Sequence, residues 1–381
     1  SQGIIQDSSV RSDREFCETL LDSTLSLSED VRDTLADSVR SYVQRIENYH
    51  VFLEPRDGFR GKVNDTLIRI PYKTRFNDVG RIKKQWAKLQ QGLEFAGRAY
   101  CTPHNGDTYE HETSDRCWLD EKPRGAVFAT LTTDPKRHRS LLEANDNMSD
   151  SVNKLMGWLS NRPETLEDGR ERWKGRLPYV KVLEFTGSSD SEYHGLPHVH
   201  VVFFDVPVNE DGMPYLVDKN ALSEYWSDNC GQGEVVDLQP LVYRENLPDS
   251  YSMDSGFVAY DEDYAGKNHE GVASNQTVGQ YLGKYLSVIY GGMLDLLEDT
   301  PELEDLDLDD KYADKAEAWK VGAYWATGKR IMSMSRGLED EVLRDDGLDY
   351  SIPSHQFLGA YHESDVPTRL WRDSVPMESF V

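Results

Sequence analysis

The sequence has few cysteines, and none of them are paired at close spacing. The four cysteines are Cys17, Cys101, Cys117 and Cys230. They form no Cys-x-x-Cys motif, so we expect neither a disulfide framework nor a thiolate cluster, and we predict a reducing, cytoplasmic compartment. Cys101, His104, His111 and Cys117 have a spacing that suits zinc. They fall in a polar segment, however, and a solvated loop without metal is the favoured interpretation.

Long apolar runs are also absent. No segment approaches the roughly 20 apolar residues that a membrane-spanning helix needs, and the first residues show no basic start followed by an apolar core. We therefore expect no membrane partner and no secretory signal. The phosphate-binding pattern Gly-x4-Gly-Lys-Ser/Thr is missing as well, so no fused ATPase is expected.

Positive charge is scarce. Asp and Glu number 68 against 42 Lys and Arg, which gives a net charge of -26. The 8 Trp, 20 Tyr and 12 Phe argue against a disordered acidic chain. A folded protein with an acidic surface is favoured, similar to proteins of salt-loving archaea, where molar salt screens charges within roughly 3 Å. The affinity that DNA-binding proteins gain by releasing counterions shrinks as salt rises, so the acidic charge does not exclude DNA.

One segment, 72–98, reverses this charge pattern. It carries seven basic and two acidic residues, a local charge of +5 (7 − 2). Two interpretations stay open for it, namely an ordinary solvated helix face and a contact surface for DNA phosphates. The same pair of interpretations applies to Arg330, Ser333, Ser335 and Arg336 near the C-terminus. The basic residues of the segment are Lys73, Arg75, Arg81, Lys83, Lys84, Lys88 and Arg98.

The spacing of apolar residues predicts an α+β fold. Helical spacing predicts helices at 28–50, 77–100, 151–159 and 277–290, the first of them capped by Ser28. Alternating or β-branched runs predict strands at 126–134, 179–186 and 198–206. This order favours a central antiparallel sheet with flanking helices, preceded by a helical N-terminal region.

We divide the chain into four parts on this basis. Residues 1–120 form a mostly helical N-terminal region, and residues 121–294 form the core. Residues 295–310 hold nine acidic residues and no basic one, which is typical of a solvated linker or loop. Residues 311–381 form a C-terminal segment that we expect to pack on the core.

Two histidines on one predicted strand are candidate metal ligands. His198 and His200 are two positions apart, so their side chains share a face of the strand. Glu184 lies in the preceding predicted strand and could face them. Two histidines and a carboxylate form a three-ligand set that leaves coordination positions open. His194 is a rival third ligand, but it falls in the loop, and a His-x-His pair on a strand also occurs without metal.

Two tyrosines and a lysine form a second candidate group. Tyr281 and Tyr285 are four positions apart, so on a helix they point the same way. Such a pair is commonly core packing. A free tyrosine hydroxyl has a pKa near 10, and a cation such as Lys284 favours its phenolate and offsets charge at a phosphate. The group therefore suits nucleophilic attack on phosphorus.

The order of these groups resembles the HUH replication initiators of rolling-circle plasmids and viruses. Their first motif, Phe-x-Thr-Leu-Thr, is matched by residues 128–132. Their His-hydrophobic-His motif is matched by His198 and His200, and their Tyr-x-x-Lys motif by Tyr281 and Lys284, with Tyr285 as the second tyrosine of the two-tyrosine subgroup. The resemblance covers about 125–290, and the acidic composition is similar to initiators from salt-loving archaea.

The resemblance implies a fold, an activity and a cofactor. The HUH endonuclease fold would carry the histidine pair at the centre of its sheet, with the tyrosine helix beside it. A divalent metal, Mg2+ or Mn2+, would be held by Glu184, His198 and His200. Tyr281 would attack single-stranded DNA at a replication origin to give a 5′-phosphotyrosine, and Tyr285 would make the second attack. Host replication proteins would be further partners.

Two departures from the family pattern bear on this prediction. Glu184 lies fourteen residues before His198, farther than in the relatives, and the stretch 207–276 between the second and third motifs is long. The alternatives are an HUH transposase or relaxase with the same chemistry, a non-catalytic DNA-binding regulator, and a metallohydrolase with its tyrosines in the core.

Overall fold

The computed structural model has an α+β fold, which confirms the predicted class. It describes residues 8–55, 66–74, 76, 78–110, 123–161, 163–165, 171–173, 176–187, 193–260, 271–273, 275–296, 317–345 and 355–376. The predicted acidic linker at 295–310 lies almost entirely outside these residues. Among the described residues, no helix combines the length and the apolar character that crossing a membrane requires.

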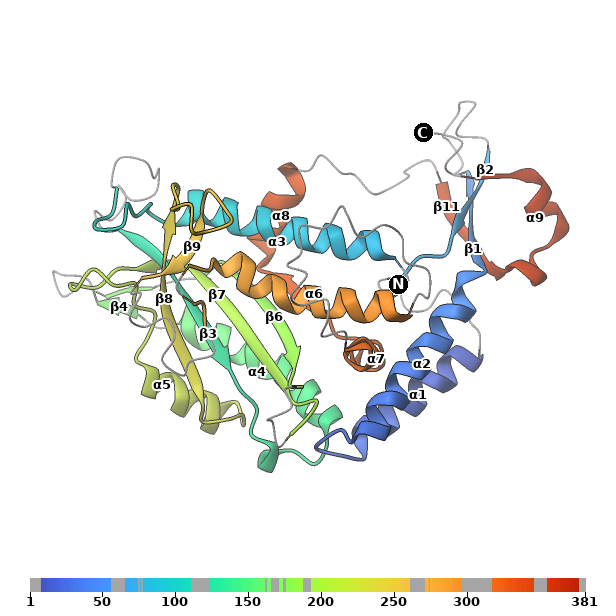
Figure 1. The fold of residues 1–381 in the computed structure, drawn as a ribbon, viewed down its shortest axis with the longest axis horizontal. Helices are drawn as coiled ribbons and strands as arrows, with labels where there is room; N and C mark the ends of the chain where they lie inside the picture. The colour runs from blue at the N-terminus through green and yellow to red at the C-terminus, as the bar shows by residue number, and fades with distance from the viewer. Residues whose placement is uncertain are drawn as a thin grey trace.

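A six-stranded antiparallel sheet forms the centre of the molecule (Figure 1). Its strand order is β10-β6-β7-β3-β8-β9, so β7 lies inside the sheet between β6 and β3. All eight residues of β3 are buried, which shows that both faces of the sheet are covered. The strands are β3 (Arg124–Leu131), β6 (Tyr179–Phe185), β7 (Pro197–Pro207), β8 (Val236–Arg244), β9 (Gly256–Ala259) and β10 (Met332–Met334).

Helices cover the two faces of this sheet. Helices α3 (Val79–Tyr100), α6 (Val278–Leu296) and α8 (Arg336–Asp345) pack on one face. Helices α4 (Leu141–Ser160) and α5 (Lys219–Glu224) pack on the other, and a short hairpin of β4 (Pro163–Thr165) and β5 (Glu171–Trp173) lies in the connection after α4. The succession β3, α4, β6, β7, α5, β8 is that of a β-α-β-β-α-β motif.

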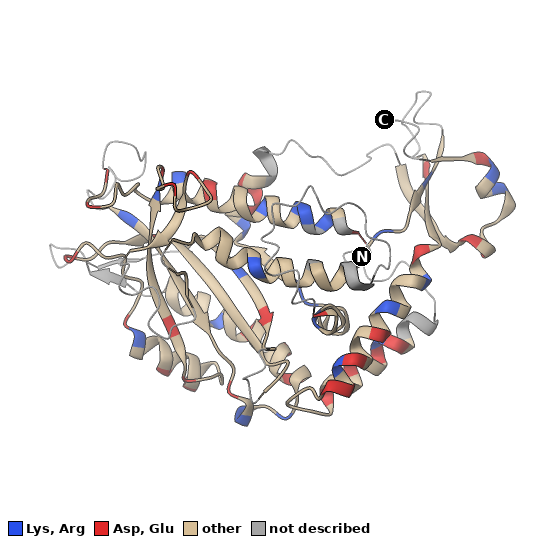
Figure 2. Cartoon of the chain, in the orientation of Figure 1, with Lys and Arg blue, Asp and Glu red and all other residues tan. Residues whose placement is uncertain are grey.

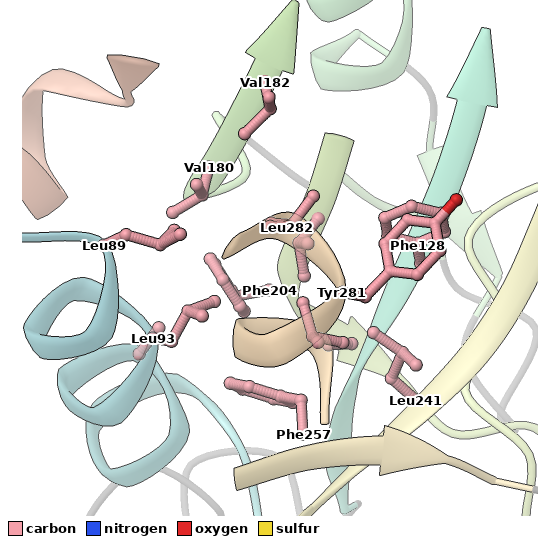
Figure 3. Close-up of a cluster of buried hydrophobic side chains, with 14 of the residues drawn as sticks. Leu89, Leu93, Phe128, Val180, Val182, Phe204, Leu241, Phe257, Tyr281 and Leu282 are labelled. Carbon is pink, nitrogen blue, oxygen red and sulfur yellow. The ribbon is translucent and has the colours of Figure 1, made fainter. Parts of the chain in front are cut away.

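The core under α3 and α6 is built from alternating strand residues and from the apolar stripes of both helices. Figure 3 shows Leu89 and Leu93 of α3 facing Leu282 of α6 and Phe204 of β7. Gly283 permits this close packing, because a Cβ atom at that position would lie 1.9 Å from Cζ3 of Trp86. A glycine inside a helix is therefore explained here by the approach of a neighbouring helix.

A third layer is formed by α1 (Ser8–Asp22), α2 (Glu29–Glu47) and α7 (Ala318–Thr327). The predicted cap of α2 is confirmed, since the amide of Val31 donates to Oγ of Ser28 at 3.4 Å. Helix α7 is buried along its length and packs against α2 and α6. It therefore ties the N-terminal helices to the face of the sheet that carries α6.

A second sheet, which the sequence did not predict, joins the two ends of the chain. Its order is β11-β1-β2-β12, and it lies apart from the six-stranded sheet (Figure 1). The N-terminal region is thus not only helical, and residues 311–381 are divided: α7, β10 and α8 pack on the core, whereas β11, α9 and β12 belong to this second unit. Its elements are β1 (Tyr49–Pro55), β2 (Leu67–Pro71), β11 (His355–His362), α9 (Thr368–Asp373) and β12 (Ser374–Pro376).

Candidate functional site

The site is centred on His200, whose side chain is fully buried on the inner strand β7. Strand pairing sets Val182 opposite His200 and Glu184 opposite His198. All these side chains therefore point to the sheet face that carries α6. His200 Nε2 lies 3.1 Å from Oε2 of Glu184, so the two side chains are in direct hydrogen-bond contact. The prediction that strand pairing would bring Glu184 back to the histidines is confirmed.

The other ring nitrogen of His200 is also engaged. Its Nδ1 lies 3.2 Å from Oγ1 of Thr130, the residue opposite His200 on β3. A histidine whose second nitrogen is held by a hydrogen bond has a fixed ring orientation, as is common for metal-bound histidines. The Phe-x-Thr-Leu-Thr segment thus contributes a positioning residue, Thr130, to the site.

His198 lies directly opposite Glu184 and is half-buried, but the three predicted ligands do not form a complete cluster. Within the described residues, no group of three or more His, Cys, Asp or Glu side chains is arranged to hold a metal ion. Two of the three ligands, Glu184 and His200, converge. The rival ligand His194 is held through its backbone, whose amide donates to Oγ of Ser26 at 3.0 Å and whose carbonyl accepts from Leu27 at 2.9 Å.

Lys320 of α7 and Glu317, which precedes this helix, complete the site, and no sequence pattern had identified either residue. Nζ of Lys320 lies 3.9 Å from Oε1 of Glu184 and 2.5 Å from Oε2 of Glu317. The Lys320 side chain is 9% exposed. Both residues follow the acidic stretch at 295–310, far along the chain from Glu184, so no local spacing could have revealed the contact.

The electrostatic environment keeps Glu184 ionised. Burial raises the pKa of its carboxyl, but the hydrogen bond from His200 and the nearby charges of His200, Lys320 and His198 outweigh burial and lower it below the ordinary value. A carboxylate at this position is therefore available at neutral pH, either as an acceptor or as a metal ligand.

The two tyrosines of α6 pack directly against His200. The His200 and Tyr285 rings are stacked, with centroids 4.8 Å apart, and the Tyr281 ring meets His200 edge-on at 5.9 Å. The Tyr285 hydroxyl donates to the Tyr281 hydroxyl at 3.0 Å. Figure 3 shows Tyr281 beside Phe128 of β3. Tyr281 is 5% exposed and Tyr285 is 7% exposed, so both belong to the core under α6.

Lys284 lies over both tyrosine rings. Its Nζ is 3.9 Å from the centroid of Tyr281 and 4.5 Å from that of Tyr285. An ammonium group over an aromatic face is attracted by the ring quadrupole. The predicted grouping of Tyr281, Lys284 and Tyr285 therefore exists in three dimensions, next to the Glu184–His200 pair.

Two stretches of the chain match models of one protein family. Residues 107–271 and 260–324 match the C-terminal domain of the domain of unknown function DUF8148, and residues 12–77 match its central domain. The chain belongs to the DUF8148 family. The site residues from Thr130 to Lys320 all fall within the matched C-terminal domain. No solved structure matches the chain.

A relative of this DUF8148 protein is "Uncharacterized protein 1" of Halorubrum pleomorphic virus 1. It is 32% identical over 314 residues, which make up 82% of this chain and 50% of the relative. The chain thus spans about half the length of that relative.

The predicted DNA-contact residues of the DUF8148 protein differ in their exposure and in their ion-pair contacts. Figure 2 shows mainly Lys and Arg among the charged residues of α3, whereas Asp and Glu outnumber Arg on α1 and α2. Arg81 lies 3.5 Å from Asp78, Lys83 is half-buried and Lys84 is exposed. Arg75 lies outside the described residues. Arg330 and Arg336, which flank β10, are both exposed.

The Cys/His segment shows no zinc cluster within the described residues, which do not include His111 or Cys117. Cys101 is buried and its thiol donates to the carbonyl of Gly125 at 3.3 Å. His104 Nδ1 accepts a hydrogen bond from the amide of Gly106 at 3.2 Å. Both residues that can be placed thus have structural roles.

Proposed function

We propose that this DUF8148 protein is a metal-dependent endonuclease of the HUH type, which nicks and joins single-stranded DNA through a tyrosine and so initiates rolling-circle replication of a virus or plasmid. The viral origin of the relative supports the context, and the acidic composition supports a salt-rich cytoplasm. Cys17, Cys101 and Cys230 are buried and form no disulfide among the described residues, which is compatible with that compartment.

One observation carries the proposal, namely the contact between two groups that lie far apart in sequence. The histidine pair of β7 and the tyrosine pair of α6 are separated by about eighty residues of chain, yet the rings of His200 and Tyr285 stack at 4.8 Å. A tyrosine nucleophile for phosphoryl transfer requires a cation and an electrophilic site beside it. Lys284 would supply the cation, and a metal held by Glu184 and His200 would supply the electrophilic site.

The donor set suits a divalent metal. Glu184 offers two carboxylate oxygens, and His200 presents Nε2, since its Nδ1 is already hydrogen-bonded to Thr130. His198 pairs with Glu184 across the two strands, and directly paired residues have Cβ atoms about 5 Å apart. These three residues would hold Mg2+ or Mn2+, and the bound metal would polarise the scissile phosphate.

The tyrosines supply the covalent step. The Tyr281 hydroxyl would release its proton to solvent and its oxygen would form a bond to phosphorus, while the bond from phosphorus to the 3′ oxygen breaks and that oxygen takes up a proton from solvent. The products are a 5′-phosphotyrosine and a free 3′-OH. Tyr285, whose hydroxyl donates to that of Tyr281, would make the second attack. Lys284 offsets the negative charge at the phosphate.

The burial of both tyrosines favours one competing function, a DNA-binding regulator without the chemistry. At 5% and 7% exposure the two hydroxyls meet a phosphate only if the covering side chains or α6 move. Transposase and relaxase activities share the covalent step and differ in the DNA that they recognise. The covalent adduct therefore separates the enzymatic functions from the regulator.

The test incubates the full chain with single-stranded DNA from the encoding genome and Mn2+ in molar KCl. We expect a DNA–protein adduct that survives denaturation, disappears with EDTA, and disappears in the Tyr281→Phe/Tyr285→Phe double variant. Tyr225→Phe is the matched control, since Tyr225 stacks on Trp158 on the opposite side of the sheet. No adduct with any strand, from a folded protein, would contradict the proposal in favour of the regulator.

A further inference from the structure

A hollow of about 190 Å³ opens between α4 and the β6–β10 edge of the six-stranded sheet. Alternation along β6 places it on the face opposite to the tyrosines: Val180 and Val182 point to α6, whereas Lys181 and Leu183 point to α4. No residue of the hollow belongs to the site around His200. The polar side chains that line it are Lys181, Lys329, Arg330, Ser149 and Ser333.

Three cations therefore share one small space. Lys181 lies on β6 directly opposite Ser333 of β10. Lys329 follows the end of α7, and its Nζ donates to Oγ of Ser149 at 3.3 Å and lies 3.0 Å from Asp146. Neither Lys181 nor Arg330 forms an ion pair with any other residue that the structure describes. Among the described residues that line the hollow there are three cations and no carboxylate, so the hollow has an excess of positive charge.

This excess of positive charge destabilises the folded chain when no anion is bound. Burial lowers the pKa of the Lys181 ammonium, and the neighbouring Lys329 lowers it further. In a protein with 68 acidic residues, carboxylates are plentiful, and Lys320 shows how a buried lysine is otherwise held, between Glu184 and Glu317. Lys181 is half-buried, and a partly desolvated lysine that lies beside other cations without such a carboxylate is the arrangement expected of a site that receives an anion.

We propose that this hollow binds a phosphate group, with Lys181, Lys329 and Arg330 as its cationic ligands and the Ser149 and Ser333 hydroxyls as further donors. Ammonium, guanidinium and hydroxyl donors converging on one point match the acceptor oxygens of phosphate. The group is either a phosphodiester of a nucleic-acid strand or a free phosphate or mononucleotide. Lys181 and Lys329 are half-buried, and contacts of partly buried charges are screened less than those of fully exposed ones, so we expect binding to persist in molar salt.

The experiment measures binding to the full chain in molar KCl. Inorganic phosphate and a thymidine mononucleotide are titrated with detection by ³¹P NMR, and a labelled single-stranded oligonucleotide is titrated by fluorescence anisotropy. We expect Lys181→Met to weaken phosphate binding by about 10-fold or more, the effect of losing one charged contact. The matched control is Lys154→Met, because Lys154 is exposed on α4 outside the hollow, and it should change binding by less than about 2-fold.

Unfolding measurements separate loss of binding from loss of folding. Without phosphate, Lys181→Met should be at least as stable as the natural chain, since it removes a desolvated cation next to another cation. A weakened response to phosphate or mononucleotide alone identifies a free ligand, and a weakened response to the oligonucleotide alone identifies a strand. If Lys181→Met and Lys154→Met bind all three probes as the natural chain does, the proposal is overturned. Tyr281→Phe/Tyr285→Phe should leave this binding unchanged, so it stands apart from the nicking reaction.

Discussion

Replacing Lys320 by methionine removes the ammonium group that lies between two carboxylates at the site. Nζ of Lys320 is 2.5 Å from Glu317 and 3.9 Å from Glu184, and its side chain is 9% exposed. Removing one partner of a buried ion pair costs about 3–5 kcal/mol, because the remaining charge is left without compensation. Glu184 and Glu317 are both about a quarter exposed, so we expect the lower end of that range, a loss of about 3 kcal/mol.

The assay is urea unfolding at neutral pH in molar KCl. The matched control is Lys219→Met, since Lys219 pairs with Asp237 at a comparable 2.9 Å but is 48% exposed. An exposed pair contributes less than about 1 kcal/mol, and molar salt screens it further. Equal losses in the two variants would refute the reasoning that burial, rather than distance, sets the value of the Lys320 contact. A second check is the Lys320→Met/Glu317→Gln double variant, which should lose less than the sum of the two single changes.

Three further predictions concern the same region. Tyr281→Phe and Tyr285→Phe each remove one hydroxyl of a buried hydrogen-bonded pair, so each should lower the free energy of unfolding by about 1–2 kcal/mol. In a double-mutant cycle, the double variant should lose less than the sum of the two single losses. Additive losses would argue against the hydrogen bond. Since the pKa of Glu184 is lower in the folded chain than the ordinary value of 4.5, its ionisation stabilises the fold above pH 4.5 and this contribution is lost as the pH falls below that value. The free energy of unfolding, measured at a series of acidic pH values, should therefore decrease less with falling pH in Glu184→Gln than in the natural chain. Gly283→Ala should destabilise by about 1–3 kcal/mol through the clash with Trp86, whereas Gly157→Ala, at an open helical position, should be neutral or stabilising; equal effects in thermal unfolding would exclude the clash.

Local sequence patterns were sufficient for the elements that carry the site. Apolar spacing predicted α2, α3 and α6, and alternation predicted β3, β6 and β7, because one face of each element is buried and the period of burial follows the backbone geometry. The predicted helix at 151–159 is the C-terminal half of α4, which begins at Leu141 with Ser140 as its cap. The shared face of His198 and His200, and of Tyr281 and Tyr285, followed from the same periods.

The longer-range features were not accessible in this way. Strands β8 and β9 lie in the stretch 207–276, whose pattern predicted nothing, since short strands are stabilised by their neighbours rather than by their own residues. The second sheet pairs β1 with β11 across about three hundred residues, and no local period records such a partner. Core packing of Tyr281 and Tyr285 was one of two open interpretations of the sequence, and only the structure showed that both side chains are nearly covered.

The sequence by itself determined the acidic surface, the α+β class and the candidate residues Glu184, His198, His200, Tyr281, Lys284 and Tyr285, since composition and periodicity are local properties. Tertiary structure alone decided which of them touch. In the folded chain the rings of His200 and Tyr285 stack, and Lys320 lies between Glu184 and Glu317. Lys181, Lys329 and Arg330 line one hollow. The physical reason is that charge pairing and ring packing act through space, between segments that only the burial of a common core brings together.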